Sequence, residues 1–562
     1  MFDSAEFTIY NWSQYRQRYL SRCSHILRRD SMKKTIVLLF VLLLSAGLLW
    51  AGGKQEEPEA EEPEMEEETA EEETAKEDKY GGTMTRAYFA PSTLDPAFTN
   101  DITGGEICGI WGDYLAYVDE DLSVDQSRSL AKNWEVSEDG LTWTFTLREG
   151  VMFHNGEEMT SEDVKFTFER LSDPDIGAAT ANLYSNIDSI SAPGKYTVVF
   201  ELKQQNPDFL SQLGEYQAII TWSGTKDFNK EHIGTGKFMI DTYLPEDRIT
   251  FKRNPDYWRT DSEGNQLPYL DGIEYLFLPE PSSQVEALRG GQVDYLIYVP
   301  TEYVSSLEAE PDIEVYEKAS NFHYAIRMRS DREPFNDVRV RQAFRAAVDR
   351  KEILEGSFEG LGVTGRDTPI GPAYGDYYLE VPEPKRDIAK AKSLLKEAGY
   401  GDGLTVTLTT QQSSAIPAIA TILKEQLADA GVTIDIQLVP PDVYYGADNL
   451  WLEADFAMTD WGSRATPQSY LNLAYTCDAQ WNESHYCDEE LDKLAAKAAV
   501  ELDKEKRAEL YAEIQRIFMD RGPLIVPYFT SNLFAATKKL KGIKPTSFFP
   551  THVDYAVVYF EE

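Results

Sequence analysis

The sequence predicts an α/β fold divided into several domains, and three observations lead to this prediction. The chain has 562 residues, more than one ordinary hydrophobic core accommodates, so we expect two or three domains. Hydrophobic residues make up 42% of the composition and aromatic residues 12%, which is enough to bury a sizeable core. In the second half of the chain, two successive units of helix, Ala-Gly and strand indicate an α/β domain with partly parallel strands.

The formal net charge of −42 excludes two classes of partner. Nucleic acid and anionic lipid both need a basic surface, so binding to either is not expected. The charge says little about a small ligand, because a local arginine pocket can lie within an acidic protein. Residues 54–79 carry fourteen acidic and three basic side chains with no apolar face, which predicts an acidic, disordered linker. A partner-binding acidic tail is the alternative.

The first 53 residues indicate export. Residues 1–31 are polar and mildly basic, and we expect them to come from an upstream start, with Met32 as the true first residue. Residues 32–53 resemble a secretory signal peptide, in which Lys33 and Lys34 precede an apolar stretch that ends in small residues. This stretch is short for a membrane span of about 20 residues, although an uncleaved anchor remains an alternative.

Cysteine positions refine the expected location. No cysteine follows the apolar stretch of the signal, so lipid anchoring there is unsupported and we expect a periplasmic or cell-surface protein. Cys477 and Cys487 lie ten residues apart in a polar stretch, and in an exported protein we expect them to close a small disulfide loop. Two unpaired thiols are the alternative if export is wrong. Cys108 would be a buried free thiol, and Cys23 precedes the signal.

The folded region begins near residue 81. Residues 83–89 predict a first strand and residues 91–96 a turn. Residues 134–136 and 141–147 alternate between apolar and polar side chains around the turn Glu138-Asp139-Gly140, which is typical of a hairpin. Thr160 or Ser161 is expected to cap a helix that begins near residue 162.

The second half continues the α/β pattern. A helix over residues 386–398 is expected to end at Gly399, and one over 418–430 at Gly431, because glycine favours the left-handed position after a helix. Strands are expected over residues 404–409, 433–439 and 523–529. Two further helices are expected over residues 490–499 and 504–520.

Residues 455–467 (DFAMTDWGSRATP) form the strongest candidate for a ligand loop. They begin as an alternating strand end and then break into a loop closed by proline. Trp461 offers a face for stacking, and Arg464 a planar fork that suits carboxylates. Ser463 would add a hydroxyl, and Asp460 is included as a fourth candidate. The alternative is a surface arginine beside a half-buried tryptophan.

Signatures of catalysis are missing. The sequence contains no G-x-S-x-G, no P-loop, no H-E-x-x-H and no G-x-G-x-x-G motif. The histidines after the signal, at positions 154, 232, 323, 485 and 552, do not pair at the spacing of metal ligands. Carboxylates are too abundant for any pair to indicate glycoside hydrolysis. We therefore expect no enzyme activity, no metal and no cofactor.

Five further stretches point to a family. They are residues 130–168, the pair 234–238 and 251–258, the step 290–295 (GGQVDY), and 334–350 (PFNDVRVRQAFRAAVDR). Their order, spacing and residues resemble the extracellular solute-binding proteins of family 5, the peptide- and nickel-type binding components of ABC importers. The resemblance covers about residues 80–560.

This resemblance implies a two-lobed, periplasmic-binding-protein type II-like fold with an extra inserted domain. The first lobe would consist of residues 80–110, 230–310 and 530–562, the inserted domain of 111–229, and the second lobe of 311–529. The lobes would enclose a polar solute and offer it to a membrane permease powered by an ATPase, with the protein acting as a monomer. A receptor or sensor with the same fold, and a secreted hydrolase, are the alternatives.

The resemblance also bears on the solute. In peptide-binding members, the segment matching residues 461–467 carries an aspartate that pairs with the α-amino group of the peptide. Here Arg464 is the nearest match, although its spacing to Pro467 differs. Like-charge contact would disfavour an ammonium group, so Arg464 is expected to bind a carboxylate or the hydroxyls of a sugar, and a modified peptide remains open. Trp222, Tyr298 and Asn321 are weaker candidates, placed where the family often lines its cleft.

Overall fold

The computed structural model describes residues 79–446, 449–547 and 552–561, all within the compact unit Lys76–Glu562. The predictions for the upstream extension, the signal peptide and nearly all of the acidic linker therefore fall outside the described residues. Among the residues described, no helix is long and apolar enough to cross a membrane.

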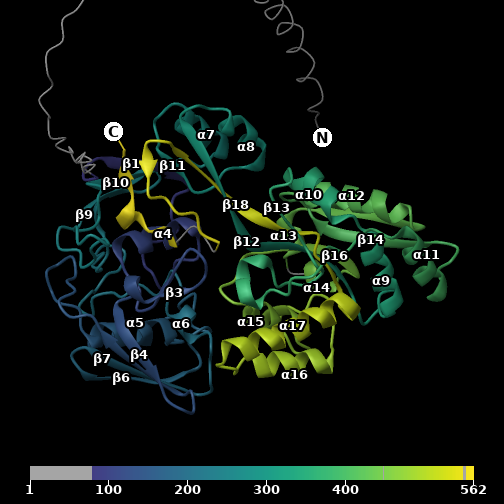
Figure 1. Ribbon diagram of the computed structural model, residues 1–562, viewed down its shortest axis with the longest axis horizontal. Helices are drawn as coiled ribbons and strands as arrows, with labels where there is room; N and C mark the ends of the chain where they lie inside the picture. Colours follow the sequence, from purple (N-terminus) through teal and green to yellow (C-terminus); the bar gives the residue numbers. More distant parts are fainter. Residues whose placement is uncertain (1–78, 447–448, 548–551, 562) are drawn as a thin grey trace, which may run out of the picture. The chain divides into compact units, whose positions relative to one another are not determined.

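A mixed sheet of twelve strands organises the described part of the chain (Figure 1). Its order is β15-β14-β16-β12-β18-β11-β1-β10-β9-β8, with β13 beside β18 and β17 beside β12. Two long strands, β12 (Ile313–Met328) and β18 (Tyr528–Thr537), lie in the middle and belong to both halves of the sheet. We call the half around β1 the first lobe and the half around β14 the second lobe.

In the first lobe, β1 pairs in parallel with β10 and β11, and the other pairings are antiparallel. Its core gathers aromatic and aliphatic side chains from these strands, from α4 and from the C-terminal segment. The strands are β1 (Thr83–Tyr88), β8 (Phe238–Leu244), β9 (Arg248–Arg253), β10 (Gly272–Phe277) and β11 (Tyr295–Leu296), with β19 (Leu540–Lys541) and β20 (Tyr559–Phe560) as a separate pair. The helices are α4 (Ile102–Trp111), α7 (Pro281–Arg289) and α8 (Thr301–Glu308).

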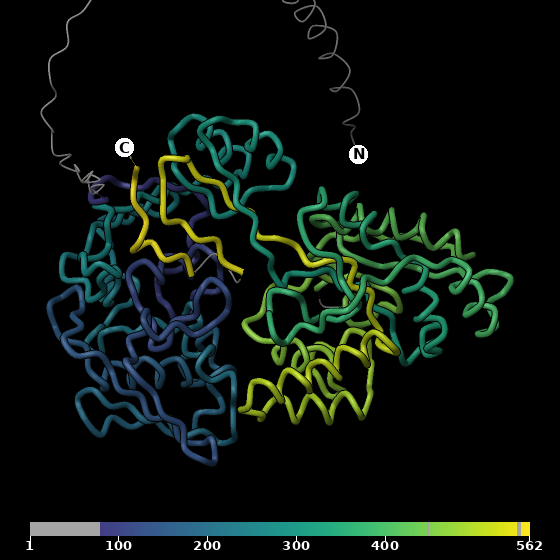
Figure 2. Tube along the Cα trace, viewed as in Figure 1, coloured from purple at the N-terminus to yellow at the C-terminus, as the bar shows by residue number. Residues whose placement is uncertain are grey.

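A second, four-stranded antiparallel sheet has its own core (Figure 2, blue segment). The predicted hairpin is confirmed as β4 (Ala131–Val136) and β5 (Thr142–Leu147), with Gly140 at φ +70° in the turn. The predicted helix is confirmed as α5 (Ser161–Ser172), where Thr160 and Asp163 form a capping box. The remaining elements are β6 (Ile187–Gly194), β7 (Thr197–Leu202), α6 (Phe209–Gln212), and the pair β2 (Tyr117–Val118) and β3 (Val124–Asp125). We refer to this part as the inserted domain.

The second lobe confirms the α/β prediction, because β14 (Leu404–Gln411) pairs in parallel with both β15 (Val432–Val439) and β16 (Phe456–Trp461). Gly399 (φ +96°) and Gly431 (φ +89°) follow two of its helices in left-handed conformations, as expected. The other strands are β13 (Gly362–Thr364) and β17 (Leu524–Ile525). The helices are α9 (Val338–Ala347), α10 (Arg350–Phe358), α11 (Ile388–Glu397), α12 (Ile416–Ala428), α13 (Pro441–Tyr444), α14 (Leu450–Glu453), α15 (Pro467–Tyr470), α16 (Glu489–Ala498) and α17 (Lys504–Arg521).

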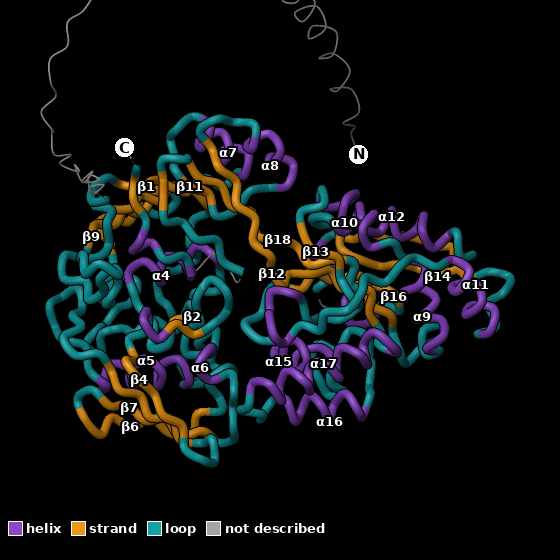
Figure 3. The backbone as a smooth tube through the Cα atoms, in the orientation of Figure 1, coloured by secondary structure: helices purple, strands orange, loops and turns teal. Residues whose placement is uncertain are grey.

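Strand β12 runs between the lobes (Figure 3), and β16 lies along its second edge towards its end. Its first part pairs with β18 from Ile313 to Ala319, and its last part pairs with β16 from His323 to Met328. The register with β18 shifts between Ala319 and His323. Such a bulge bends a strand and redirects its side chains, and here it lies beside the end of β16.

Candidate functional site

The loop after β16 has a firmly held backbone. Trp461 ends β16 opposite His323 of β12, and residues 462–466 then lead into α15. The Tyr470 hydroxyl donates to the Gly462 carbonyl at 2.9 Å, and the Tyr374 hydroxyl donates to the Arg464 carbonyl at 2.8 Å. The loop is therefore a fixed support for the Arg464 side chain.

Ser463 and Asn321 join this loop to the bulge in β12. The Asn321 backbone N–H donates to the Ser463 hydroxyl at 3.2 Å. Asn321 is fully buried, and its side-chain amide has no hydrogen-bond partner among the described residues. The structure thus brings together two predicted site residues that are 142 positions apart in the chain.

A cavity of about 330 Å³ lies between the lobes next to this junction. Tyr298, which is 47% exposed, lines it from the first lobe, and Ser463 and Gly462 line it from the second. Strand β18 supplies one wall. We call this the interlobe cavity; its walls also include Tyr88, Ile102, Ile297, Val299, Thr301, Phe322, Tyr324, Phe358, Ser414, Thr530, Ser531, Asn532 and Leu533.

A second cavity of about 270 Å³ lies within the second lobe and shares Gly462 with the first. Four aromatic side chains and two charged ones line it, so we call it the aromatic cavity. Its walls are Tyr445, Trp451, Thr459, Asp460, Trp461, Gly462, Arg464 and Trp481.

Arg464 is half-buried, and its guanidinium forms no hydrogen bond or ion pair with any described residue; its Nε is buried without a partner. Glu215 of the inserted domain lies within electrostatic reach. Burial raises the pKa of Glu215 to about 7, and the positive charge of Arg464 offsets part of this rise. Burial also lowers the pKa of His323 to about 4, with a smaller contribution from Arg464. The guanidinium is thus a fixed positive charge with a neutral imidazole nearby.

Trp461 is only 5% exposed, because its ring packs against Tyr470, Tyr475 and Trp481. Its indole N–H donates to the Glu483 carboxylate at 2.9 Å. Trp461 therefore lines the aromatic cavity as part of a packed cluster of rings and has no free face on which a solute could stack.

Asp460, the neighbouring candidate, lines the same cavity. Its Oδ1 accepts from the side-chain amide of Gln411 and from the Tyr445 hydroxyl, the latter at 3.3 Å. No Lys, Arg or His in the described part of the chain forms an ion pair with it.

Trp222 is not brought to this site. It is half-buried against the core of the inserted domain and lines neither of the two cavities. Its place late in the inserted domain suggested a cleft position, but the local fold turns the indole towards Gly224 and the domain core.

A buried ion pair joins the inserted domain to the second lobe close to the loop. Arg507 of α17 contacts both oxygens of Asp208 at 2.5 and 2.9 Å, and the Thr466 hydroxyl donates to Asp208 Oδ2 at 2.9 Å. The side chains of Arg507 and Asp208 are 3% and 10% exposed. Thr466 lies two residues after Arg464. Its hydrogen bond to Asp208 therefore ties the candidate loop of the second lobe to the inserted domain.

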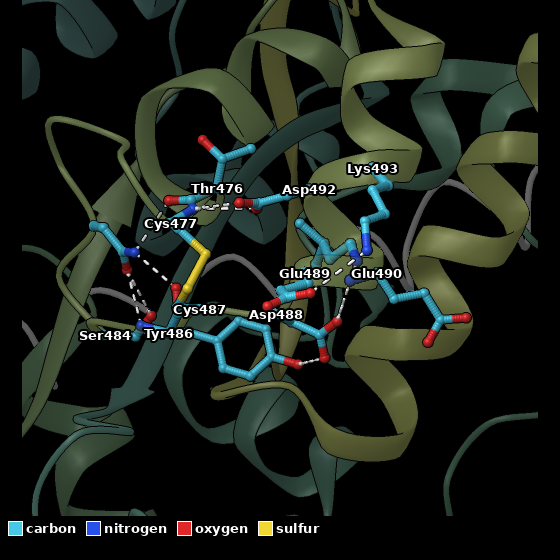
Figure 4. The surroundings of a disulfide bond; sticks show 12 residues. Thr476, Cys477, Ser484, Tyr486, Cys487, Asp488, Glu489, Glu490, Asp492 and Lys493 are labelled. Atoms are coloured by element: carbon cyan, nitrogen blue, oxygen red, sulfur yellow. Dashed lines mark hydrogen bonds and ion pairs between the residues drawn. A yellow bond between two sulfur atoms is a disulfide. The ribbon is translucent and has the colours of Figure 1, made fainter.

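The structure joins Cys477 and Cys487 in a disulfide (Figure 4), and Cys108 is a free, buried cysteine. The Cys477 backbone N–H donates to Asp492 Oδ1 at 3.1 Å, which ties the disulfide loop to α16. The loop also contains Trp481 and Glu483, which line and support the aromatic cavity. In the described part of the chain, no three His, Cys, Asp or Glu side chains cluster as a metal site would require.

Sequence reasoning missed several residues of this site, among them Tyr445, Trp451, Trp481, Glu215 and the pair Asp208–Arg507. Tyr445 and Trp451 lie in short helical turns before β16, and a tyrosine is weak evidence in a chain with 32 of them. Glu215 and Asp208 are single carboxylates in a very acidic sequence. Only the fold shows that they face the loop.

Comparison with known proteins gives one family. The family model described as bacterial extracellular solute-binding proteins, family 5, middle region, matches residues 127–482. The glutathione-binding protein GsiB of Salmonella typhimurium is 28% identical over 477 residues, covering 80% of this chain and 89% of the relative. Di/tripeptide-binding protein 1 of Pseudomonas aeruginosa is 29% identical over 446 residues, covering 73% and 81%.

Solved structures share the fold. HbpA2 from Haemophilus parasuis superposes with a TM-score of 0.77 at 24% identity, covering 86% of this chain and all of that one. The binding protein AgaA of A. tumefaciens R10, solved with agropinic acid, gives a TM-score of 0.67 at 25% identity, covering 86% and 99%. The two-lobed α/β architecture predicted from the sequence is therefore confirmed.

Proposed function

Because the chain belongs to the bacterial extracellular solute-binding proteins of family 5, we propose that it is the solute-binding component of an ABC importer. It captures a polar, carboxylate-bearing solute between its two lobes and delivers it to a membrane permease that an ATPase drives. Membership of the family confirms the prediction of a binding protein rather than an enzyme. Export through the signal peptide would place it in the periplasm or on the cell surface.

The state of the Arg464 guanidinium is the observation that favours a carboxylate-bearing solute. Arg464 is half-buried and lines the aromatic cavity, which shares Gly462 with the interlobe cavity, and it has no ion-pair partner among the described residues. Glu215, with a pKa of about 7, offsets this charge only in part. Enclosing the rest of the charge between closing lobes costs free energy unless the ligand supplies the opposite charge. A carboxylate does so with two parallel hydrogen bonds.

The other classes of solute compensate the Arg464 charge less well. A sugar hydroxyl can accept from the guanidinium but leaves its charge uncompensated, so neutral oligosaccharides fit less well. An α-ammonium group placed at Arg464 would meet a like charge. We therefore propose that ordinary peptides do not bind through their N-terminus at this position, whereas modified peptides with a free carboxylate remain compatible.

The similar proteins support a carboxylate-bearing solute without identifying it. Glutathione and agropinic acid, named for two of them, both carry carboxylate groups. The di/tripeptide-binding relative makes ordinary peptides a necessary arm of any test.

Isothermal calorimetry tests the proposal with matched ligands and variants. Solutes with a free carboxylate are compared with their methyl esters, with di- and tripeptides, and with neutral oligosaccharides. We expect Arg464→Gln to weaken carboxylate binding about 10- to 100-fold, the range for a charge-assisted hydrogen bond, and esterification to have a similar effect on the wild type.

Arg516→Gln is the control, because Arg516 is an exposed arginine on α17 in the same lobe and its substitution should leave affinity unchanged. Micromolar binding of ordinary peptides that is unaffected by Arg464→Gln would refute the proposal.

A further inference from the structure

The aromatic cavity contains charges of both signs. Asp460 and Arg464 line it together, and all its walls come from residues 445–481 of the second lobe. The cavity therefore exists in one lobe alone, before any ligand is enclosed. At about 270 Å³ it lies just below the range of complete ligand pockets, so it suits one end of a solute.

Neither charged group has an ion-pair partner among the described residues, and the Glu215 carboxyl group, whose pKa burial raises to about 7, acts on Arg464 only at longer range and is only partly ionised near neutral pH. Asp460 accepts from neutral groups, the Gln411 amide and the Tyr445 hydroxyl, and forms no ion pair among the residues described. Arg464 likewise has no ion pair there, and none of its nitrogens lies within 4 Å of an Asp460 carboxylate oxygen although both residues line the cavity. By contrast, Glu483 behind the same wall contacts Arg327 at 3.5 Å.

The aromatic walls of the cavity favour a cation near Asp460, because the Tyr445 hydroxyl donates to Asp460 and the Tyr445 ring lines the same cavity. Tyr445 and Trp451 lie with ring centroids 5.8 Å apart, and Trp451 and Trp481 lie 6.3 Å apart. Tyr445 is 42% exposed, so its face is accessible. Tryptophan and tyrosine faces attract ammonium groups, most strongly where water is excluded.

We propose that the aromatic cavity binds a terminal group of the solute that carries an ammonium and a carboxylate on the same carbon, with the ammonium on Asp460 and the carboxylate on Arg464. This inference rests on the proposed function and narrows its solute class. Gly462 lines both cavities, so the remainder of the solute extends past it into the interlobe cavity.

This chemistry separates solutes that look alike. The N-terminus of an ordinary peptide has an ammonium but no carboxylate on its first carbon, and the C-terminus has the reverse. An amino acid joined through its side chain, as in γ-glutamyl or Nε-acyl-lysyl compounds, keeps both groups free on one carbon. Of these three end groups, only the last one presents both groups on one carbon to Asp460 and Arg464.

Calorimetry with three matched probes tests the proposal: γ-glutamyl-alanine, its α-linked isomer, and glutaryl-alanine, which lacks the amine. An Nε-acyl-lysine serves as a second compound with the same end group on a different tail. We expect the wild type to prefer both compounds with the complete end group over glutaryl-alanine and over the α-linked isomer by at least tenfold. Tryptophan fluorescence should change on binding, because three tryptophans line the cavity.

Variants then assign each charge. Asp460→Asn should weaken γ-glutamyl-alanine about tenfold and leave glutaryl-alanine within twofold, a difference that a purely structural effect would not produce. Arg464→Gln should weaken both. Asp435→Asn, at an exposed position on β15, is the control and should change neither.

Three results would overturn the inference. They are glutaryl-alanine binding as tightly as γ-glutamyl-alanine, equal losses for both probes in Asp460→Asn, and no binding of either end-group compound at millimolar concentration. If other free carboxylates still bind and depend on Arg464, the proposed function stands while this inference fails. If a neutral sugar binds in place of all carboxylates, both fail.

Discussion

At the scale of single residues, the environment of a side chain decides its role more than its type does. Arg464 is half-buried and Arg507 is almost fully buried, both in the second lobe. Arg507 has a bidentate carboxylate partner, whereas Arg464 has no ion-pair partner among the described residues. Arg507 therefore makes a structural contact, whereas Arg464 is available to a solute. From the sequence, Arg464 could be selected because it follows a tryptophan in a proline-closed loop. Its missing partner could not be inferred, since partners come from distant segments.

Buried histidines predict how stability depends on pH. Burial lowers the pKa of His552 to about 4, and its Nε2 contacts the Gly214 carbonyl at 2.7 Å. In the unfolded chain His552 becomes protonated below about pH 6.5, whereas in the folded chain it becomes protonated only near pH 4. Stability contributed by neutral His552 is therefore complete above pH 6.5 and decreases as the pH falls towards 4, by about 2 kcal/mol between pH 7 and pH 5.

Thermal unfolding followed by circular dichroism at pH 7, 6 and 5 measures this effect. As the pH is lowered, the melting temperature of the wild type should fall relative to that of His552→Gln, because Glu215, whose raised pKa contributes the opposite trend, is present in both proteins. Equal slopes in the two proteins would show that His552 does not contribute.

At the scale of elements, local patterns predicted what local interactions determine. The helices α11, α12, α16 and α17 and the strands β14 and β15 lie within two residues of their predicted bounds, because caps, glycines and apolar periodicity act over a few residues. The bulge in β12 was not predicted. It depends on β18 and β16, which follow it by more than a hundred positions.

The disulfide loop is the element whose loss should reach the site. Removing the Cys477–Cys487 bond frees a segment that carries Trp481 and Glu483. A loop of this size stabilises by at most about 3 kcal/mol. We expect Cys477→Ala/Cys487→Ala to lower the melting temperature and to weaken solute binding, with reduction of the wild type giving the same result.

Cys108 provides the internal control for that experiment, since it is free and buried and is present in both proteins. A reductant that lowers the melting temperature of the double variant as well would assign the effect to something other than this disulfide. An unchanged melting temperature on reduction of the wild type would contradict the prediction.

At the scale of the whole described unit, β12 and β18 connect the two lobes. The Asp208–Arg507 ion pair makes a second connection, between the inserted domain and the second lobe, through residues outside these two strands. Hinge closure around a ligand brings such surfaces together. The two-lobed arrangement could be predicted from the order of family motifs. The ion pair could not, because neither residue lies in a motif.

We expect Asp208→Asn to favour a more open arrangement. Removing one partner of a buried ion pair leaves the other charge uncompensated, and Arg507 regains water only if the lobes separate. The Thr466 hydroxyl also loses a charged acceptor, so solute should dissociate faster.

Distances between nitroxide labels at Ser189 of the inserted domain and Lys392 of α11, both exposed, report this change without any ligand. The distribution should shift to longer distances in Asp208→Asn. Glu355→Gln, which removes the exposed Lys351–Glu355 pair, should leave it unchanged. Identical distributions in all three proteins would rule out a role for Asp208 in closure.

Native mass spectrometry of the purified protein is the most direct test of whether Arg464 selects a carboxylate-bearing solute. We expect the wild type to carry a bound compound with a free carboxylate and Arg464→Gln, purified in parallel, to have lost it. A neutral sugar or an ordinary peptide retained equally by both proteins would show that Arg464 does not select the solute.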